Sequence, residues 1–442
     1  MTIHNAPVES RDVWLAGHLA GELRRTRTGE VQFAYSPSWC VRPDVYPLSY
    51  SLPLSHGTDV QAGPHVAAFF ENLLPDSDRI RARLARGFEA ASTTAFDLLT
   101  VLGRDCAGAI EVTSGMAFPA SASAGAALSR AELAEILRCA TGGAGAADND
   151  VHLPAVALAG AQEKTAFAKV EGAWYMPSAG RPSTHIFKVP LGLVGNMRAD
   201  MSASVENEWL CAQLLAAYGL PVAGCEIEVF EGQKALVVER FDRRLDRRGG
   251  ETVRVHQEDL CQAAGVAPEY KYESDGGPGI ARALRLMQAK GVSEEDQHVF
   301  FTAQILFWMM GATDGHAKNF SLVLEGGRPP RLAPLYDVLS IYPILGQGAN
   351  QMAWQRAKLA MAIRSKNTHY HLKNILRRHW GGMAARCGLN LDVEALLSKL
   401  VDRTPKVLAC CGEGLPPGFP VRVADTIFTG LTLSAAKLKS GA

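Results

Sequence analysis

The periodicity of the chain changes near residue 250, and this change restricts the folds that the chain can adopt. Residues 151–250 contain short apolar stretches that favour strands, with one helical segment among them, "SASVENEWLCAQLLAAYGLP". In that segment Ser204 is the predicted N-cap and Gly219 the predicted end. Beyond residue 251 apolar residues recur mostly at helical spacing, as in "GIARALRLMQAKG". We therefore expect a strand-rich lobe followed by a helical lobe.

A separate α+β domain is predicted ahead of these lobes. Residues 11–35 favour a hairpin or meander, and "FDLLTVLGRDCAGAIEV" indicates a helix, a turn and a strand. Low-complexity connectors then flank a short helix in which Ser129 and Glu132 have the spacing of a capping box. The expected parts are an N-terminal domain at 1–115, a linker at 116–150, a strand-rich lobe at 151–250 and a helical lobe at 251–442.

Composition excludes some classes of protein. A chain of 442 residues is long enough for two or three packed units, and 45 basic residues balance 45 acidic ones, so net charge gives no nucleic-acid signal. Nine cysteines without a C-x-x-C motif favour reduced thiols. No signal peptide is evident, and the longest apolar stretch, near 303–312, is too short to span a bilayer. We expect a soluble cytoplasmic protein with no membrane partner.

The segment "TDGHAKNFSLV" carries the strongest chemical signal. Asp314 and Asn319 have the Asp-x4-Asn spacing with which protein kinases supply a catalytic carboxylate and a Mg²⁺ ligand. Asp337 follows in "APLYDVLS", and the stretch between predicts a hairpin that would return Asp337 to the side of Asn319. Both residues of the first pair could instead be turn formers after a helix. The downstream aspartate and the two-lobed pattern favour the kinase interpretation.

The strand-rich lobe offers candidate phosphate-binding groups. Lys188 in "THIFKVP" would share a strand face with Ile186 and could reach the phosphates of ATP. Its partner in a kinase helix could be Glu206 or Glu208, and helix geometry does not choose between them. The turn "ALAGAQEKTA" is not a Walker A loop, but backbone amides around Gly160 could cover phosphates.

Three further segments are open to two interpretations. The end of "VVERFDRR" could be an adenine-contacting hinge at Glu239, Arg240 and Phe241, or a strand end with surface charges. His316 fits a catalytic-loop histidine better than a zinc ligand, since no second His or Cys stands nearby at zinc spacing. The stretch "KYESDGGPGIARAL" predicts a loop at a helix N-terminus, with no ligand assigned.

Together these segments resemble the HipA family, the serine/threonine-kinase toxins of bacterial type II toxin–antitoxin operons. The similarity runs over nearly the whole chain. It is carried by "FFENLLPDS", "FDLLTVLGRD", "AGAQEKTA", "THIFKVP", "VERFDRR", "HQEDLCQ", "KYESDGGPGIAR", "GATDGHAKNFS" and "PLYDVLS". The fold class implied is α+β, a bilobal protein-kinase-like fold with an added N-terminal α+β domain and a helical C-terminal lobe.

The resemblance implies ATP and Mg²⁺ as cofactors and assigns roles by position. Asp314 would be the catalytic base, Asn319 and Asp337 the Mg²⁺ ligands, and Lys188 a phosphate ligand. The nucleotide contacts would be Ala159, Gly160, Ala161, Gln162, Glu163, Lys164, Lys188, Glu239, Arg240, Phe241, His316, Ala317, Lys318, Asn319, Tyr336 and Asp337. The family's inhibitory autophosphorylation serine corresponds here to Ala157, so either the natural protein lacks this switch or the chain is a Ser→Ala variant.

The resemblance also implies partners. Family members phosphorylate a serine of an aminoacyl-tRNA synthetase, glutamyl-tRNA synthetase being the best-known target, which causes growth arrest and persistence. A HipB-like helix-turn-helix antitoxin dimer neutralises them, and the complex represses its own operator DNA. Two other functions remain open at this level, a small-molecule kinase and a catalytically silent co-repressor that braces a DNA-binding partner.

Overall fold

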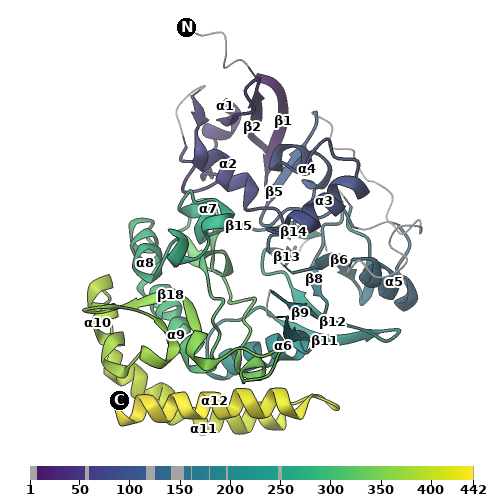
Figure 1. The fold of residues 1–442 in the computed structure, drawn as a ribbon. Coiled ribbons are helices and arrows are strands. Elements are labelled where there is room, and N and C mark those ends of the chain that lie inside the picture. Colours follow the sequence, from purple (N-terminus) through teal and green to yellow (C-terminus); the bar gives the residue numbers. More distant parts are fainter. Residues whose placement is uncertain are drawn as a thin grey trace. The chain divides into compact units, whose positions relative to one another are not determined.

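The computed structural model in Figure 1 divides the chain into two compact units. It describes residues 7–54, 59–115, 125–140, 154–160, 162–178, 180–195, 198–246 and 251–441. Unit 1 comprises Met1–Val189, Glu228–Tyr270 and Ser321–Pro330, and unit 2 comprises Pro190–Ile227, Lys271–Phe320 and Arg331–Ala442. Both units combine helices with strands, as the predicted fold class requires.

The N-terminal part of unit 1 is an antiparallel sheet packed against helices. The strand order is β4-β3-β2-β1-β5, so the predicted meander over 11–35 is confirmed. The strands are β1 (Pro7–Leu15), β2 (His18–Thr26), β3 (Val31–Tyr35), β4 (Val60–Ala62) and β5 (Ile110–Thr113). The helices are α1 (Pro37–Cys40), α2 (Pro64–Glu71), α3 (Asp78–Gly87) and α4 (Ala95–Leu102). Their apolar faces form one core, which includes Phe33, Phe69 and Leu99.

A second five-stranded sheet carries several of the predicted site residues. Its order is β11-β12-β8-β6-β7, formed by β6 (Lys164–Val170), β7 (Ala173–Tyr175), β8 (His185–Lys188), β11 (Cys225–Phe230) and β12 (Gln233–Glu239). Helix α5 (Arg130–Ala140) packs its Leu133 and Leu137 into a core with Phe167 and Phe187 of the sheet. The predicted capping box of α5 is confirmed, because the Glu132 carboxylate accepts from Ser129 while the Ser129 hydroxyl accepts from the amide of Glu132.

Residues 151–250 were expected to favour strands, but residues 156–159 form none, which corrects that expectation. The amide of Ala157 instead donates to the carbonyl oxygen of Asp105, and the Ala157 side chain is fully buried in the N-terminal core. Apolar composition could not distinguish a sheet strand from an extended segment packed on another domain.

The remaining elements of unit 1 include short strands after the second sheet. These elements are β13 (Arg243–Leu245), β14 (Thr252–Arg254), β15 (His256–Asp259), α7 (Leu260–Ala263) and β16 (Ser321–Leu324). Strand β15 pairs antiparallel with β16, so the segment "HQEDLCQAAG", which lies in the part of the chain expected to be mostly helical, begins as a strand. Only its second half forms the short helix α7, whose Asp259 and Gln262 make a capping box.

Unit 2 is mainly helical, and it combines most of the predicted helical lobe at 251–442 with Pro190–Ile227 of the predicted strand-rich lobe. Its helices are α6 (Ser204–Ala217), α8 (Ile280–Ala289), α9 (Glu294–Met310), α10 (Arg377–Cys387), α11 (Val393–Glu413) and α12 (Val421–Ser440). Its strands are β9 (Gly192–Val194), β10 (Ala199–Met201), β17 (Arg331–Leu332), β18 (Lys358–Arg364) and β19 (Thr368–His371). The predicted N-cap of α6 is wrong by one residue, since Ala203 occupies that position and the Ser204 hydroxyl accepts from the amide of Leu191.

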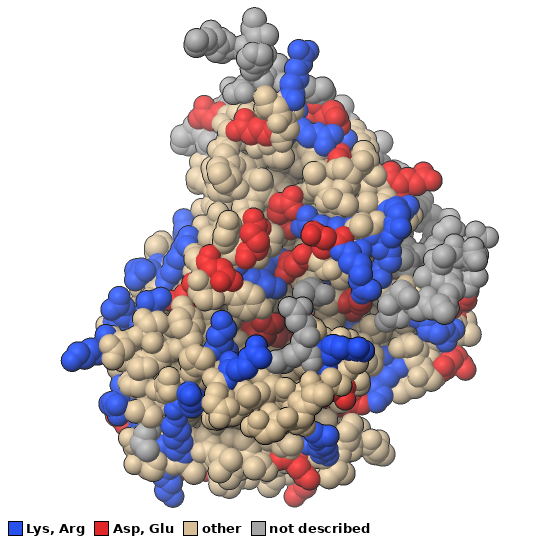
Figure 2. Space-filling model, in the orientation of Figure 1, with Lys and Arg blue, Asp and Glu red and all other residues tan. Residues whose placement is uncertain are grey.

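Two further features concern the length of the helices and the charge of the surface. Among the described residues, no helix combines the length and the apolar character needed to cross a membrane. On the face shown in Figure 2, both basic and acidic side chains are present, in agreement with the balanced count of 45 and 45.

Candidate active site

The loop that carries Asp314 follows the buried helix α9. Gly311 ends this helix in the left-handed region, at φ +64°, which a glycine adopts without strain. Gly315 then passes over the helix so closely that a Cβ atom there would lie 2.5 Å from the ring of Phe307. The first glycine thus ends the helix and the second lets the chain pass close to it. Asp314 is exposed between them.

Asn319 joins the two acidic segments of the site. It lies at the end of a short 3-10 helix, Ala317–Asn319, and its Nδ2 donates to the carbonyl oxygen of Asp314 at 2.9 Å. The same Nδ2 lies 3.4 Å from the carbonyl oxygen of Asp337. Asp337 thus returns to the side of Asn319, as the predicted hairpin required. The side-chain oxygen of Asn319 accepts no hydrogen bond from the described residues and is available as an oxygen ligand.

The second acidic segment is held in an uncommon backbone conformation. Asp337 has φ +60°, in the left-handed region that aspartate tolerates better than most residues. The preceding Tyr336 donates its hydroxyl to the carbonyl oxygen of Lys318 at 2.9 Å. Both residues are therefore fixed to the loop of Asp314. Sparsely populated conformations of this kind concentrate at functional sites.

Sequence reasoning missed Tyr272 as a site residue. Its hydroxyl donates to Oδ1 of Asp314 at 2.6 Å, and its ring lies edge-to-face on the ring of His316 at 5.1 Å. The next residue, Glu273, accepts from Nε of Arg364 at 2.8 Å and from the amide of Ala362 at 2.6 Å, which anchors the loop to β18. The motif "KYESDGGPG" indicated a loop, but nothing in it identified a partner 42 positions away.

Two lysines in unit 1 stand on one face of the second sheet. Lys164 of β6 and Lys188 of β8 are directly opposite in the antiparallel register. Two cationic side chains on one face of a sheet can together bind an anionic group such as a phosphate. The ammonium of Lys164 also lies over Gly160, because a Cβ atom at Gly160 would lie 2.6 Å from that nitrogen. Ile186 lies on this same face, as the strand alternation predicted, and packs with Leu158.

In the predicted hinge segment the Arg240 side chain is buried, whereas Glu239 is exposed. Glu239 is exposed and pairs with His185 across the sheet. The guanidinium of Arg240 is buried and contacts Asp242 at 2.8 Å and Asp105 at 3.5 Å. A contact of Arg240 with adenine would therefore involve its main chain. Asp105 also accepts from Arg243 at 2.8 Å, which makes this segment part of a buried ion cluster with the N-terminal domain.

The nucleotide loop, defined as residues 159–164, rests on protein groups on both sides. Gln162 donates to the carbonyl oxygen of Val189 at 3.0 Å, and Glu163 pairs with Arg83 of α3. Ala161 lies outside the described residues. In unit 2, Glu206 and Glu208 are both buried on α6, and which of them pairs with Lys188 stays a prediction.

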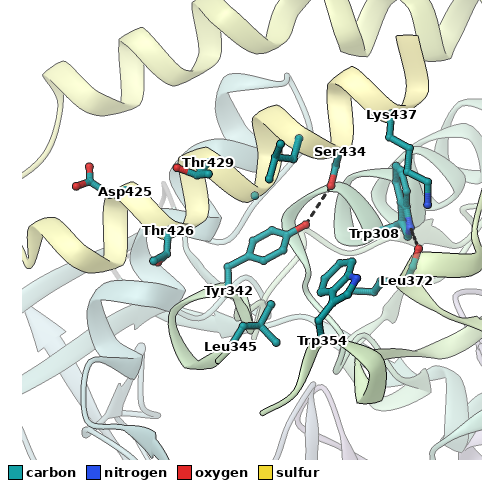
Figure 3. Close-up of a pocket in the computed structure, with 12 residues that line it drawn as sticks. Trp308, Tyr342, Leu345, Trp354, Leu372, Asp425, Thr426, Thr429, Ser434 and Lys437 are labelled. Carbon is teal, nitrogen blue, oxygen red and sulfur yellow. Dashed lines mark hydrogen bonds between the residues drawn. The ribbon is translucent and has the colours of Figure 1, made fainter. Parts of the chain in front are cut away.

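A cavity of about 540 Å³ in unit 2 is a separate feature. Figure 3 shows its walls, which come from α9, α12, the segments before β18 and the turn after β19, and which include none of the predicted site residues. Tyr342 lines this cavity, and its hydroxyl donates to the carbonyl oxygen of Met309 at 3.0 Å. The ring fits against α12 because position 430 is a glycine, where a Cβ atom would lie 2.3 Å from the ring.

Comparison with known families decides the classification. Residues 156–408 match the family model described as HipA-like C-terminal domain, which is more than half of the chain, and residues 11–113 match the HipA N-terminal domain. The chain belongs to the HipA family of kinases.

Individual HipA-family relatives cover most of the chain. It is 34% identical over 409 residues to "Putative kinase Y4mE" of Sinorhizobium fredii, with 90% of each chain covered. It is 27% identical over 347 residues to the serine/threonine-protein kinase toxin HipA of Shewanella oneidensis, with 75% of each covered. A solved complex of Shewanella oneidensis MR-1 HipA, HipB and operator DNA matches with a TM-score of 0.75 and 23% identity over 97% of both chains. That likeness shows the HipA fold.

Proposed function

We propose that this HipA-family chain is an ATP- and Mg²⁺-dependent serine/threonine protein kinase that acts as a toxin. The observation that carries the proposal is the grouping of Asp314, Asn319 and Asp337, held together by the Asn319 side chain at 2.9 and 3.4 Å from two carbonyl oxygens. A carboxylate beside two oxygen ligands for a hard cation is the equipment that phosphoryl transfer requires.

The roles of the residues follow from their chemistry. Asp314 is exposed and would orient the acceptor hydroxyl and take its proton. The Asn319 side-chain oxygen and the Asp337 carboxylate would hold Mg²⁺, which completes its coordination with phosphate and water oxygens. Lys164 and Lys188 would bind the phosphates from the sheet face. ATP would supply its γ-phosphoryl group to the acceptor oxygen, and ADP would leave with the negative charge on the former β–γ bridging oxygen.

The substrate and the partners are proposed from the relatives. We infer that the acceptor is a serine of a translation protein, with an aminoacyl-tRNA synthetase such as glutamyl-tRNA synthetase as the first candidate, and that its modification arrests growth and gives persistence. The Shewanella oneidensis complex contains HipA, HipB and operator DNA, which supports a HipB-like antitoxin here and DNA binding through that antitoxin. Both activities would operate in the cytoplasm.

The experiment is transfer of labelled phosphate from ATP in a lysate of the source cell. The proposal predicts one dominant labelled protein, which mass spectrometry identifies, and loss of that label with Asp314→Asn. Labelled small metabolites without a labelled protein would instead establish a small-molecule kinase. Absence of any label, together with operator binding in the presence of the antitoxin, would establish a silent co-repressor.

A further inference from the structure

The nucleotide loop is attached to the N-terminal domain at two points. The amide of Asp76 donates to the carbonyl oxygen of Gly160 at 3.0 Å, and Pro75 and Gly160 form a parallel bridge. Three residues further along the loop, Glu163 contacts Arg83 of helix α3. All these residues belong to unit 1.

The contact between Arg83 and Glu163 has the geometry of a strong ion pair. Nη1 and Nη2 of Arg83 donate to the two carboxylate oxygens of Glu163 at 3.0 and 2.5 Å, so the pair is bidentate. The Glu163 side chain is 14% exposed and the Arg83 side chain 24%, which limits screening by water. Arg79 adds a single contact at 3.1 Å, but its side chain is 76% exposed, so its contribution is smaller.

These two attachments hold the loop on either side of Gln162, in the segment to which the proposed function assigns the contact with ATP phosphates. Gly160 is fixed at one end and Glu163 at the other, and Lys164 follows directly at the start of β6, opposite Lys188. A loop without the attachment would have to be ordered when nucleotide binds, and that ordering costs conformational entropy. The N-terminal domain removes this cost in advance.

We propose that Arg83 is a positioning residue for nucleotide binding, and that the N-terminal domain is a working part of the nucleotide site. This inference rests on the proposed kinase function, since it assigns to the loop the contact with ATP phosphates. Arg83 acts through Glu163 and does not itself touch the nucleotide. The N-terminal domain would thereby contribute to the affinity for ATP.

The test compares Arg83→Gln with Arg86→Gln on the same helix. Arg86 is a matched control because, among the described residues, its side chain contacts only the carbonyl oxygen of Ala82. We expect Arg83→Gln to raise the KM for ATP and its Kd by roughly five- to tenfold, the scale of a typical coupling between sites, with a much smaller change in kcat. The charge swap of Arg83→Glu with Glu163→Arg should recover most of the lost affinity, whereas either change alone should not.

Hydrogen exchange separates the failure of this inference from the failure of the proposed function. Amides of 158–165 should exchange faster in Arg83→Gln than in Arg86→Gln, whether or not any kinase activity is measured. If Arg83→Gln does not fold, Glu163→Gln provides the same comparison from the other partner. Unchanged KM, Kd and exchange in a folded Arg83 or Glu163 variant would overturn the inference while leaving the kinase assignment intact.

Discussion

The hydroxyl of Tyr272 donates a hydrogen bond of 2.6 Å to Oδ1 of Asp314. This bond holds one carboxylate oxygen of Asp314, and under the proposed function the other oxygen would accept the proton of the substrate hydroxyl. The loop of Tyr272 is in turn held by the ion pair between Glu273 and Arg364, whose closest atoms are 2.7 Å apart. A carboxylate that acts as a base has to point at the group whose proton it accepts, and these contacts would hold Asp314 in one orientation.

Tyr272→Phe should therefore lower kcat while the KM for ATP changes little. A hydrogen bond to a charged group contributes about 1.5–3 kcal/mol, so we expect a loss of at least roughly tenfold. Tyr270→Phe is the matched control, because Tyr270 is two positions earlier and 51% exposed. Equal steady-state rates for the two variants would show that the Tyr272 hydroxyl has no part in orienting Asp314.

Asp337→Ala should weaken the binding of ATP in the presence of Mg²⁺. The change removes a charged oxygen ligand next to Asn319, and Mg²⁺ depends on few such ligands from the protein. Calorimetric titration should show a lower affinity with Mg²⁺ and little change in EDTA. An equal affinity of the variant and the natural protein for Mg–ATP would contradict the assignment of Asp337 as a metal ligand.

The buried ion cluster around Asp105 should stabilise unit 1. The Asp105 carboxylate contacts Arg243 at 2.8 Å and Arg254 at 3.0 Å, and all three side chains are at most 8% exposed. Asp105→Asn removes the carboxylate that these guanidinium groups share, although Arg243 keeps Asp242 at 3.1 Å and Arg254 keeps Glu111 at 3.6 Å. We therefore expect a loss of unfolding free energy at the lower end of roughly 3–5 kcal/mol. Asp44→Asn removes only an exposed pair with Arg42 and should cost less than about 1 kcal/mol.

The same cluster predicts how stability depends on pH. Burial alone would raise the pKa of Asp105, but the guanidinium groups of Arg240, Arg243 and Arg254 outweigh it and hold this pKa well below its usual range. A lowered pKa in the folded state means that the stabilisation is present above the unfolded pKa, near 4, and is lost as pH falls. Denaturation curves should therefore show that the difference in unfolding free energy between the natural protein and Asp105→Asn becomes smaller below about pH 4. A difference that stays constant down to pH 2 would exclude this contribution.

Ala157→Ser should create a site of self-modification that the present chain lacks. Ala157 is fully buried, so a phosphate with up to two negative charges cannot stay at that position. The segment before the nucleotide loop would have to leave the N-terminal core, and affinity for ATP should then fall. Intact-mass spectrometry after incubation with Mg–ATP should show one added phosphate in the variant and none on the 157–166 peptide of the unchanged protein. Phosphate on that peptide of the unchanged protein would refute the prediction.

Local signals in the sequence predicted the parts of this molecule that depend on local chemistry. The capping box of Ser129 and Glu132 and the spacing of Asp314 and Asn319 both involve groups a few positions apart. The return of Asp337 to Asn319 was also predictable, since a short hairpin is the simplest connection between two strands.

Contacts between segments far apart in the chain could not be predicted from the sequence. Tyr272 and Asp314 are 42 positions apart, and Arg83 and Glu163 are 80 apart, with no periodic pattern that links them. The sequence left Arg240 open as a hinge residue or a surface charge, and it did not show that the guanidinium joins a buried cluster with Asp242 and Asp105. Charge alone did not show which arginines would be buried, because burial depends on partners that only the fold brings together.

The role of Asp314 as the base is tested most directly by the rate of phosphate transfer by Asp314→Asn. An amide cannot accept the substrate proton, so we expect a loss of at least about a hundredfold in kcat with nearly unchanged affinity for Mg–ATP. Asp275→Asn is the matched control, because Asp275 is an exposed aspartate in the loop of Tyr272 and should retain the natural rate. Near-natural turnover of Asp314→Asn would contradict the assignment of Asp314 as the base and, with it, the proposed active site.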